Sequence, residues 1–276
     1  MLELPEVLCM ARQLDETLVG RTVTSVDVPA GRPKFLFLSP DMPAFETTLV
    51  GRRVQEVTSR GRWIFCSLDD ERTLLFGEFG GRLLFHRPGE SLPLKRHWIA
   101  EFDDGSRLSL AIQMWGFLGV LTQAEIARHP YAGTLGFTPL DPQFTETAFF
   151  ERLDRHAAAE DRPIKAFLTH SPNVAGIGNG YLQDILFRAH LSPKRKVSTL
   201  SGDERHALYV SLRHTLKQAA GLAGRDTERD LFDRPGRYVP LLDSRAAGQP
   251  CPDCGTTIAK IQYLGGSCYI CPRCQT

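Results

Sequence analysis

The sequence predicts an α+β protein of several domains, because three kinds of pattern follow one another along its 276 residues. Short alternating segments fill the first half, helical periodicity fills most of the second half, and paired CxxC motifs come last. We therefore expect a β-rich domain with an N-terminal helix at 1–125, a linker at 126–145, a helical domain at 146–240 and a zinc ribbon at 246–276.

The composition is that of a globular protein, since 42% apolar residues can bury a sizeable core. No apolar run approaches the roughly 20 residues of a membrane helix, and the acidic amino terminus is unlike a secretory signal. We expect a cytosolic protein, nucleoid-associated in a bacterium, without a membrane partner. For the oligomeric state we expect a monomer.

A formal net charge of +1 provides little general attraction for nucleic acid, so such a partner has to be inferred from local basic clusters. Each cluster could equally be solvated surface. The clusters are Arg52–Arg53, Arg60 with Arg62, Lys95–Arg96–His97 and Lys194–Arg195–Lys196.

The β-rich domain opens with a helix. In MLELPEV, Pro5 stands in the first helical turn, apolar residues recur on one face as far as Leu18, and Gly20 lies beyond the end. Strand-like segments run from about 21 to 125, and the Asp-Gly pair within 103–106 predicts a hairpin turn. This pattern is typical of an antiparallel sandwich or barrel.

Helical periodicity resumes after the linker. Ser201 followed by Glu204 is a capping-box signature for the last helix, whose stripe of Leu208, Leu212 and Leu216 is most simply core. The four helical segments lie at 145–153, 162–168, 180–189 and 201–224.

A glycine-rich turn, NVAGIGNGY, joins the second and third of these helices. The bare backbone around Gly178 could hold a phosphate, and two helices joined this way resemble DNA-binding helix–turn–helix elements. The spacing is not that of a dinucleotide fingerprint, and no strand precedes it. Asn179 could contact a phosphate through its amide, or it could cap the helix of Tyr181.

The last segment predicts a structural zinc site. Its thiols follow a C-x2-C-x16-C-x2-C pattern, with a hairpin expected to turn at Gly265–Gly266. A pair of redox CxxC motifs is the alternative, and a scattered disulfide framework does not suit the uneven cysteine spacing. Four protein ligands leave no open position for catalysis. The ligands are Cys251, Cys254, Cys271 and Cys274, with Cys268 outside the pattern.

Three parts of the sequence carry a resemblance to a known family: ELPEV, then IKAFL with VAGIGNGYLQDILFRA, and finally CPDC with CPRCQ. Together they make the chain similar to the formamidopyrimidine-DNA glycosylase and endonuclease VIII superfamily. The resemblance spans the whole chain. It implies a β-sandwich domain, a helix–two-turn–helix domain and a zinc finger, with lesion-containing or abasic double-stranded DNA between the domains. It also implies base-excision repair on a flipped nucleotide.

The resemblance places the chemistry at the amino terminus, where the family has a nucleophilic proline followed by a catalytic glutamate. Glu3 matches that glutamate, but Leu2 replaces the proline, so a covalent attack would fall to the amine of Met1. Alternatively, Glu3 activates water as a general base, with Glu6 as its neighbour or as a helix N-terminal charge. Arg62 replaces a catalytic lysine, keeping the charge but not the transferable proton.

The same resemblance implies phosphate contacts from Lys165 and Asn179, beside Gly178 of the glycine turn. By contrast, Gly266 replaces an arginine of the zinc hairpin that grips phosphate in the family.

The residues that would fill the space of a flipped base are aromatic in this chain. Phe79 matches a methionine wedge, and Trp115 and Phe117 match the arginine and phenylalanine beside it. Aromatic rings can stack on bases, but they cannot read the partner base by bidentate hydrogen bonds. All three could instead belong to the core of the sandwich.

Three functions follow from these observations. The leading one is a DNA glycosylase with atypical or weak AP-lyase activity, and its rival is a non-catalytic binder of damaged or distorted DNA. A zinc-ribbon module for RNA or protein explains least of the chain.

In the loop 224–238, Thr227, Arg229 and Tyr238 are candidates for base contact or are exposed loop residues.

Overall fold

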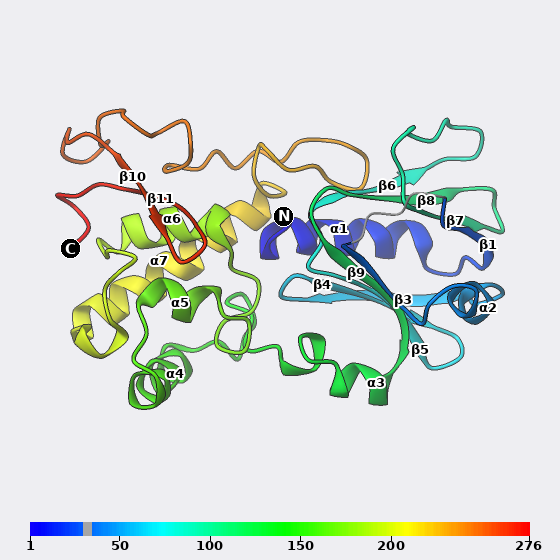
Figure 1. The fold of residues 1–276 in the computed structure, drawn as a ribbon, viewed down its shortest axis with the longest axis horizontal. Coiled ribbons are helices and arrows are strands. Elements are labelled where there is room, and N and C mark those ends of the chain that lie inside the picture. The colour runs from blue at the N-terminus through cyan, green and yellow to red at the C-terminus, as the bar shows by residue number, and fades with distance from the viewer. Residues whose placement is uncertain (30–34) are drawn as a thin grey trace. The chain divides into compact units, whose positions relative to one another are not determined.

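The computed structural model describes residues 1–29 and 35–276, and the chain divides into two compact units. Unit 1 comprises Met1–Thr134 and Ala223–Arg237, and unit 2 comprises Leu135–Leu222 and Tyr238–Thr276 (Figure 1). The segment after the last helix, which we assigned to the helical domain, thus packs with unit 1.

Unit 1 is a β-sandwich, as predicted. One sheet has the order β1-β7-β8-β6 and is antiparallel throughout, and the other has the order β2-β9-β5-β4-β3. Only β2, which pairs with β9, is parallel to its neighbour within the described strands. The strands are β1 (Val23–Asp27), β2 (Leu36–Ser39), β3 (Val54–Arg60), β4 (Trp63–Leu68), β5 (Arg72–Gly77), β6 (Gly81–His86), β7 (Trp98–Phe102), β8 (Arg107–Ile112) and β9 (Gly116–Thr122).

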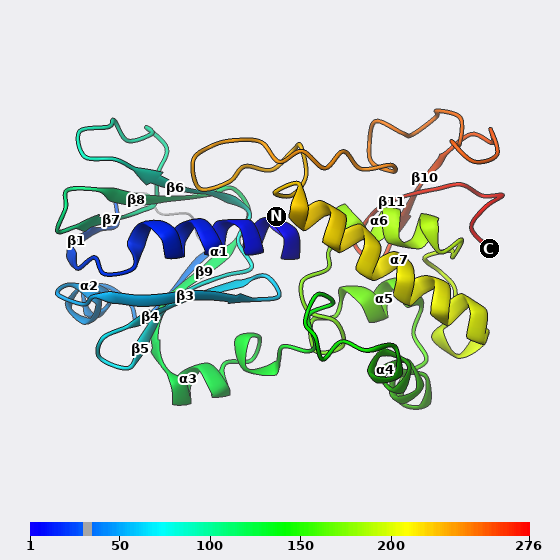
Figure 2. The ribbon, with the colours of Figure 1, turned by 180° about the vertical axis from the view of Figure 1, so that it is seen from behind.

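The N-terminal helix α1 (Leu4–Leu18) runs lengthwise along this sandwich (Figure 2). Pro5 stands in its first turn, and its apolar stripe from Val7 to Leu18 is buried in the core that the sheets share. Gly20 adopts a left-handed φ of 87° just beyond the end, where glycine has no steric penalty. Three short helices complete the unit: α2 (Ala44–Leu49), α3 (Gln123–Arg128) and η1 (Ala132–Thr134).

The predicted Asp-Gly hairpin joins β7 to β8. Glu101 pairs with Arg107, the Phe102 N–H donates to the Ser106 carbonyl oxygen (2.9 Å), and Gly105 has a φ of 77°. An L-residue other than Asn or Asp rarely adopts that φ, which is why the turn needs glycine.

Unit 2 carries the predicted helices. Ser201 caps the last helix by accepting from the Glu204 N–H (3.2 Å), while the Glu204 carboxylate accepts from the Ser201 N–H (2.8 Å). Leu208, Leu212 and Leu216 are buried, as expected of the core stripe. The helices are α4 (Glu146–Ala159), α5 (Ile164–Thr169), α6 (Asn179–Arg188), η2 (Val197–Thr199) and α7 (Gly202–Gly221).

A two-stranded hairpin, β10 (Ala259–Tyr263) and β11 (Gly266–Ile270), lies beside α6 in unit 2 (Figure 1). Its turn falls at Leu264–Gly265, one residue earlier than predicted, because Tyr263 pairs with Gly266. Both turn residues have positive φ, 47° and 74°, as a two-residue type I′ turn requires. Among the described helices, none has the length and apolarity needed to cross a membrane.

Candidate functional site

Two carboxylates are buried at the start of α1 around one guanidinium. Glu3 and Glu6 are each 3% exposed, and Arg225 is 8% exposed. Arg225 lies 3.1 Å from Glu6 Oε1 and 3.6 Å from Glu3 Oε1. Burying such charges is costly unless they are paired, so the three groups depend on one another.

Glu6 has a structural role that the geometry makes plain. Its carboxylate accepts from the backbone N–H of Glu3 (2.9 Å), which is one half of a capping box, and from the backbone N–H of Arg225 (2.9 Å). Gly224 has a φ of 88°, and a Cβ there would collide with the Glu6 side chain. Glu6 thus joins the helix start to the loop that follows α7.

The terminal amine also lies in this cluster. The Met1 ammonium is 3.4 Å from Glu228 Oε1. The Leu2 N–H donates to the carbonyl oxygen of Phe79 (3.4 Å), and the Leu2 side chain is buried in the sandwich core. As long as Met1 is present, the nitrogen of Leu2 is a peptide nitrogen whose N–H is already donated to the Phe79 carbonyl oxygen.

Arg62 lies next to the terminus within unit 1. Its guanidinium is 2.8 Å from Glu78 Oε2 and donates to the Met1 sulfur at 3.3 Å. Burial raises the pKa of Glu78, while the charge of Arg62 opposes that shift. The structure therefore brings together Met1, Glu3, Glu6 and Arg62, which the resemblance placed in one site.

Arg225 is the site residue that our sequence reasoning missed. It lies in the loop GRDTERDLF, which we noted for other residues, and no local pattern connects it with Glu3 or Glu6, more than 200 positions away. Only the buried carboxylates, which need a cation, could have suggested that such a partner exists.

Replacing Arg225 by methionine is expected to destabilise the protein by about 3–5 kcal/mol, because two buried carboxylates lose their common cation. The free energy of unfolding from urea titration measures the effect. Arg229→Met, at an exposed position of the same loop, is the control. Equal stabilities of the two variants would contradict this account of the cluster.

The three candidate wedge aromatics lie in different environments. Phe79 is buried in the sandwich core, as the alternative interpretation expected. Phe117 is half-buried between Trp63 and His129, with ring centroids 5.6 and 4.7 Å away. Trp115 is 40% exposed in the turn between β8 and β9, so it is the best placed of the three to meet a base.

The glycine turn positions Gly178 as the N-cap of α6, so Asn179 is the first helical residue and not the cap. The Asn179 amide occupies the space beside Gly266 where a Cβ would lie. Lys165 on α5 is 2% exposed, and its ammonium donates to the Tyr263 carbonyl oxygen (2.6 Å) and to Cys268 Sγ (3.3 Å). Lys165 and Asn179 therefore meet at the zinc hairpin.

Lys165→Ala is expected to reduce the slope of log binding constant against log salt by about one unit if its ammonium binds a DNA phosphate. Fluorescence anisotropy with a labelled duplex at several salt concentrations measures that slope. Lys217→Ala, on an exposed part of α7, is the control for simple loss of charge. A lower melting temperature with an unchanged slope would show that Lys165 stabilises the zinc hairpin but does not bind DNA.

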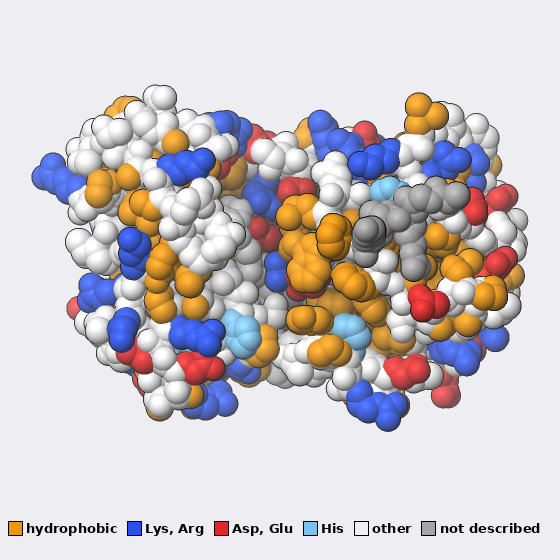
Figure 3. Space-filling view, in the orientation of Figure 1, with side chains coloured by type: hydrophobic (Ala, Val, Ile, Leu, Met, Phe, Trp, Pro, Cys, Tyr) orange, Lys and Arg blue, Asp and Glu red, His pale blue; other side chains and the backbone are white. Residues whose placement is uncertain are grey.

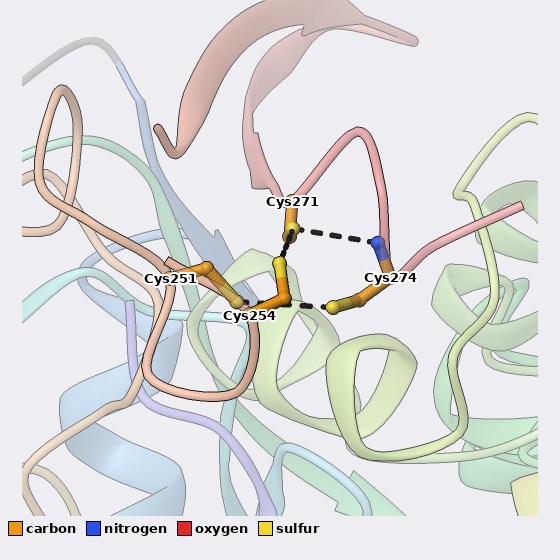
Figure 4. A group of neighbouring side chains, drawn as sticks. All are labelled: Cys251, Cys254, Cys271 and Cys274. Carbon is orange, nitrogen blue, oxygen red and sulfur yellow. Dashed lines mark hydrogen bonds between the residues drawn. The ribbon is translucent and has the colours of Figure 1, made fainter. Parts of the chain in front are cut away.

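The four predicted zinc ligands converge at the base of the hairpin (Figure 4). Their sulfur atoms all lie within 4.8 Å of one another, with 3.9 Å between Cys251 and Cys274 and 3.5 Å between Cys254 and Cys271. Tetrahedral zinc with sulfurs at ~2.3 Å requires sulfur separations of roughly 3.8 Å. The thiols thus fit a structural Zn²⁺ with no open position.

Cys268 is not part of the zinc set. It is fully buried on β11 and accepts from Lys165.

The loop 224–238 belongs to unit 1 as far as Arg237, and Tyr238 belongs to unit 2. Leu231 is buried in the sandwich core, and its N–H donates to the Gln13 side chain (3.0 Å). Thr227 and Arg229 are exposed. Tyr238, in contrast, is buried in unit 2 and donates to Asp184 (2.6 Å), so it is neither an exposed loop residue nor accessible to a base.

Several of the basic clusters are neutralised locally. Arg52 lies 3.0 Å from Asp70, and Arg195 lies 3.1 Å from Glu204. Arg62, described above, differs from these two because it and its partner Glu78 are both half-buried, with 16% and 14% of their side chains exposed. Surface ion pairs of the first kind contribute little to stability and say little about a partner.

The fold and the site define a protein of three parts: a β-sandwich with a buried carboxylate pair at its first helix, a helical segment and a zinc hairpin. Family profiles match the same parts. The Formamidopyrimidine-DNA glycosylase N-terminal domain matches residues 1–113, the H2TH domain of that glycosylase matches 135–229, and the zinc finger found in FPG and IleRS matches 248–276. The chain belongs to the formamidopyrimidine-DNA glycosylase family.

Individual relatives are similar over nearly the whole chain. Formamidopyrimidine-DNA glycosylase of Chloroflexus aurantiacus is 34% identical over 99% of this chain and 97% of its own length. That of Geobacillus kaustophilus is 31% identical over 99% of both. The Lactococcus lactis Fpg, solved in complex with DNA containing an abasic site, superimposes with a TM-score of 0.86 at 24% identity over 99% of both chains, which shows the fold.

Proposed function

We propose that this protein is a DNA glycosylase of base-excision repair, which releases a damaged base from double-stranded DNA in the cytoplasm. The observation that carries the proposal is Glu3, buried beside Arg225 and the amino terminus, in a chain whose relatives are named formamidopyrimidine-DNA glycosylase. Lesion-containing DNA as the partner is supported by solved relatives bound to abasic-site and Fapy-dG DNA.

Base release requires an oxygen of water to bond to C1′ of the deoxyribose while the bond from C1′ to the base nitrogen breaks. The base leaves with the electron pair and takes up a proton. Glu3 can accept the proton of the attacking water, as a general base does. Arg62, which Glu78 holds at 2.8 Å, contacts a phosphate of the same nucleotide through its remaining N–H groups in this proposal.

Strand cleavage through a covalent intermediate needs a nucleophilic amine at C1′. The nitrogen of Leu2 is engaged with Phe79, and the Met1 ammonium is ion-paired with Glu228 and has no lone pair in that state. We therefore propose that base release exceeds lyase activity, and that any covalent adduct forms at Met1 after the pair with Glu228 opens.

A labelled panel of duplexes with oxidised, alkylated or deaminated bases tests the proposal. Release of free base from at least one duplex is the expected result, with little adduct trapped by borohydride on abasic DNA. Mass spectrometry of the intact purified protein shows whether the chain begins at Met1 or at Leu2.

A non-catalytic binder of damaged DNA is the second candidate, because Leu2, Arg62 and Gly266 all depart from the family pattern. Tight binding to a lesion duplex without base release from any member of the panel would favour it. Base release would eliminate it.

A further inference from the structure

Unit 2 carries a second cluster of basic residues, which the proposed function does not use. A cavity of about 210 Å³ opens between α4 and the segment from α5 to residue 173. On α4, Arg152, Arg155 and His156 project from one helical face, since they are spaced by three and four residues. Other residues that line it are Arg162, His170 and Asn173.

The lining of the cavity includes more cationic than anionic side chains. The cavity is lined by three arginines and one carboxylate, Glu160, which is already paired with Arg162 at 2.7 Å. The neighbouring Asp161 accepts from the Ser198 N–H at 2.9 Å, and Asp154 pairs with Arg205 at 2.6 Å. Figure 3 shows Lys and Arg side chains and a histidine, with Asp and Glu side chains among them, over the α4 and α5 part of unit 2.

Two of the lining groups lack anionic partners. Arg155 donates to the Glu151 carbonyl oxygen (3.3 Å) and forms no ion pair with any residue in 1–29 or 35–276. The Nε2 atom of His156 is buried and has no hydrogen-bond partner within those ranges. A buried polar atom without a partner is costly, and an anion oxygen would satisfy it.

Arg152 and His156, on the α4 side of the cavity, are held in place before any ligand arrives. The Arg152 guanidinium donates to the carbonyl oxygen of Pro172 (2.8 Å) and stacks over the ring of Phe137, 4.2 Å from its centroid. His156 packs edge-on against Phe167, with centroids 5.1 Å apart. Burial lowers the pKa of His156, the Glu160 carboxylate opposes that shift, and the charge of Arg162 adds to it. A preformed cationic cavity is expected to hold an anion.

We propose that this cavity is a phosphate-binding site, formed by Arg155, His156 and Arg162 and distinct from the proposed catalytic cluster. Its volume is below that of sites for drug-sized ligands, about 300–1,000 Å³, but ample for one phosphate group. Arginine forks match phosphate oxygens in geometry and charge. The phosphate belongs either to a free anion or nucleotide, or to a nucleic-acid strand.

Titration of the full-length, zinc-loaded protein with inorganic phosphate by isothermal calorimetry, at constant ionic strength in chloride, tests the proposal. The double variant Arg155→Gln/Arg162→Gln is expected to weaken phosphate binding by at least about tenfold, since two charge-assisted contacts are lost. Lys217→Gln removes an exposed charge elsewhere on unit 2 and is expected to bind like the unsubstituted protein.

A short oligonucleotide without a terminal phosphate separates the two sources, because its phosphates are all internal phosphodiesters. Binding of this oligonucleotide that inorganic phosphate competes away and that the double variant loses assigns the site to nucleic acid; binding of inorganic phosphate alone assigns it to a free anion. Absence of saturable phosphate binding, or equal binding by the double variant and Lys217→Gln, would overturn the proposal. Base release, measured in parallel, is expected to persist in the double variant, so failure of the proposed function is seen separately.

Discussion

Glu3→Gln is expected to slow base release from a lesion duplex by about 10²- to 10⁴-fold, the usual contribution of a general acid or base. Glutamine keeps the shape of the side chain but cannot accept the proton of the attacking water. Single-turnover release of a labelled base, with protein in excess, measures the chemical step apart from DNA binding. Affinity for the same duplex is expected to change far less.

The fold tolerates this change because Arg225 retains two carboxylate neighbours, Glu6 at 3.1 Å and Glu228 at 3.3 Å. Glu16→Gln is the matched control, since Glu16 is an exposed residue of the same helix. If Glu3→Gln and Glu16→Gln release base at the same rate, Glu3 is not the catalytic group and the site must be reassigned.

Cys271→Ser is expected to release the zinc and to unfold the segment 248–276, with loss of binding to lesion DNA. A two-stranded hairpin is at best marginally stable in water. Here it is supported by a small buried cluster that includes Phe187, Leu242 and Ile258. Structural zinc binding contributes about 10–16 kcal/mol in small zinc domains, far more than such a cluster. Zinc content by atomic absorption and melting by circular dichroism measure the effect.

Cys268→Ser is the matched control, because Cys268 lies on the same hairpin but outside the set of four thiols. This variant is expected to retain one zinc per chain, since the serine hydroxyl can still accept from Lys165. Zinc lost from Cys268→Ser and kept in Cys271→Ser would mean that the ligand set is wrong.

Local patterns predicted the elements well. Pro5 and the apolar stripe up to Leu18 predicted α1, and the Ser201 and Glu204 pair predicted the start of α7. These signals work because capping and periodic burial depend on residues only three or four positions apart. The turn of the zinc hairpin was misplaced by one residue, because a Gly-Gly pair is the usual signal for such a turn, whereas here Leu264 adopts the positive φ that leucine rarely has.

Contacts between distant segments were not predictable in the same way. Nothing near Glu3 indicates that Arg225 supplies its charge partner, and nothing near Lys165 indicates that its ammonium is buried against Tyr263 and Cys268. The phosphate cavity was also missed, because its basic residues are mixed in sequence with Asp154, Glu160 and Asp161. The fold alone decides which of these charges face one another.

The sequence by itself determined the β-rich first half, the helical part and the zinc ligands, because these depend on local periodicity and spacing. The choice of a sandwich and the family came from the resemblance, which spans the whole chain. Only the tertiary structure decided that Glu6 is a structural group, that Tyr238 is buried, and that Leu2 nitrogen is engaged with Phe79. The physical reason is that burial and charge pairing are properties of the packed chain. The free energy of a carboxylate depends on which residues surround it after folding, however far away they lie in the sequence.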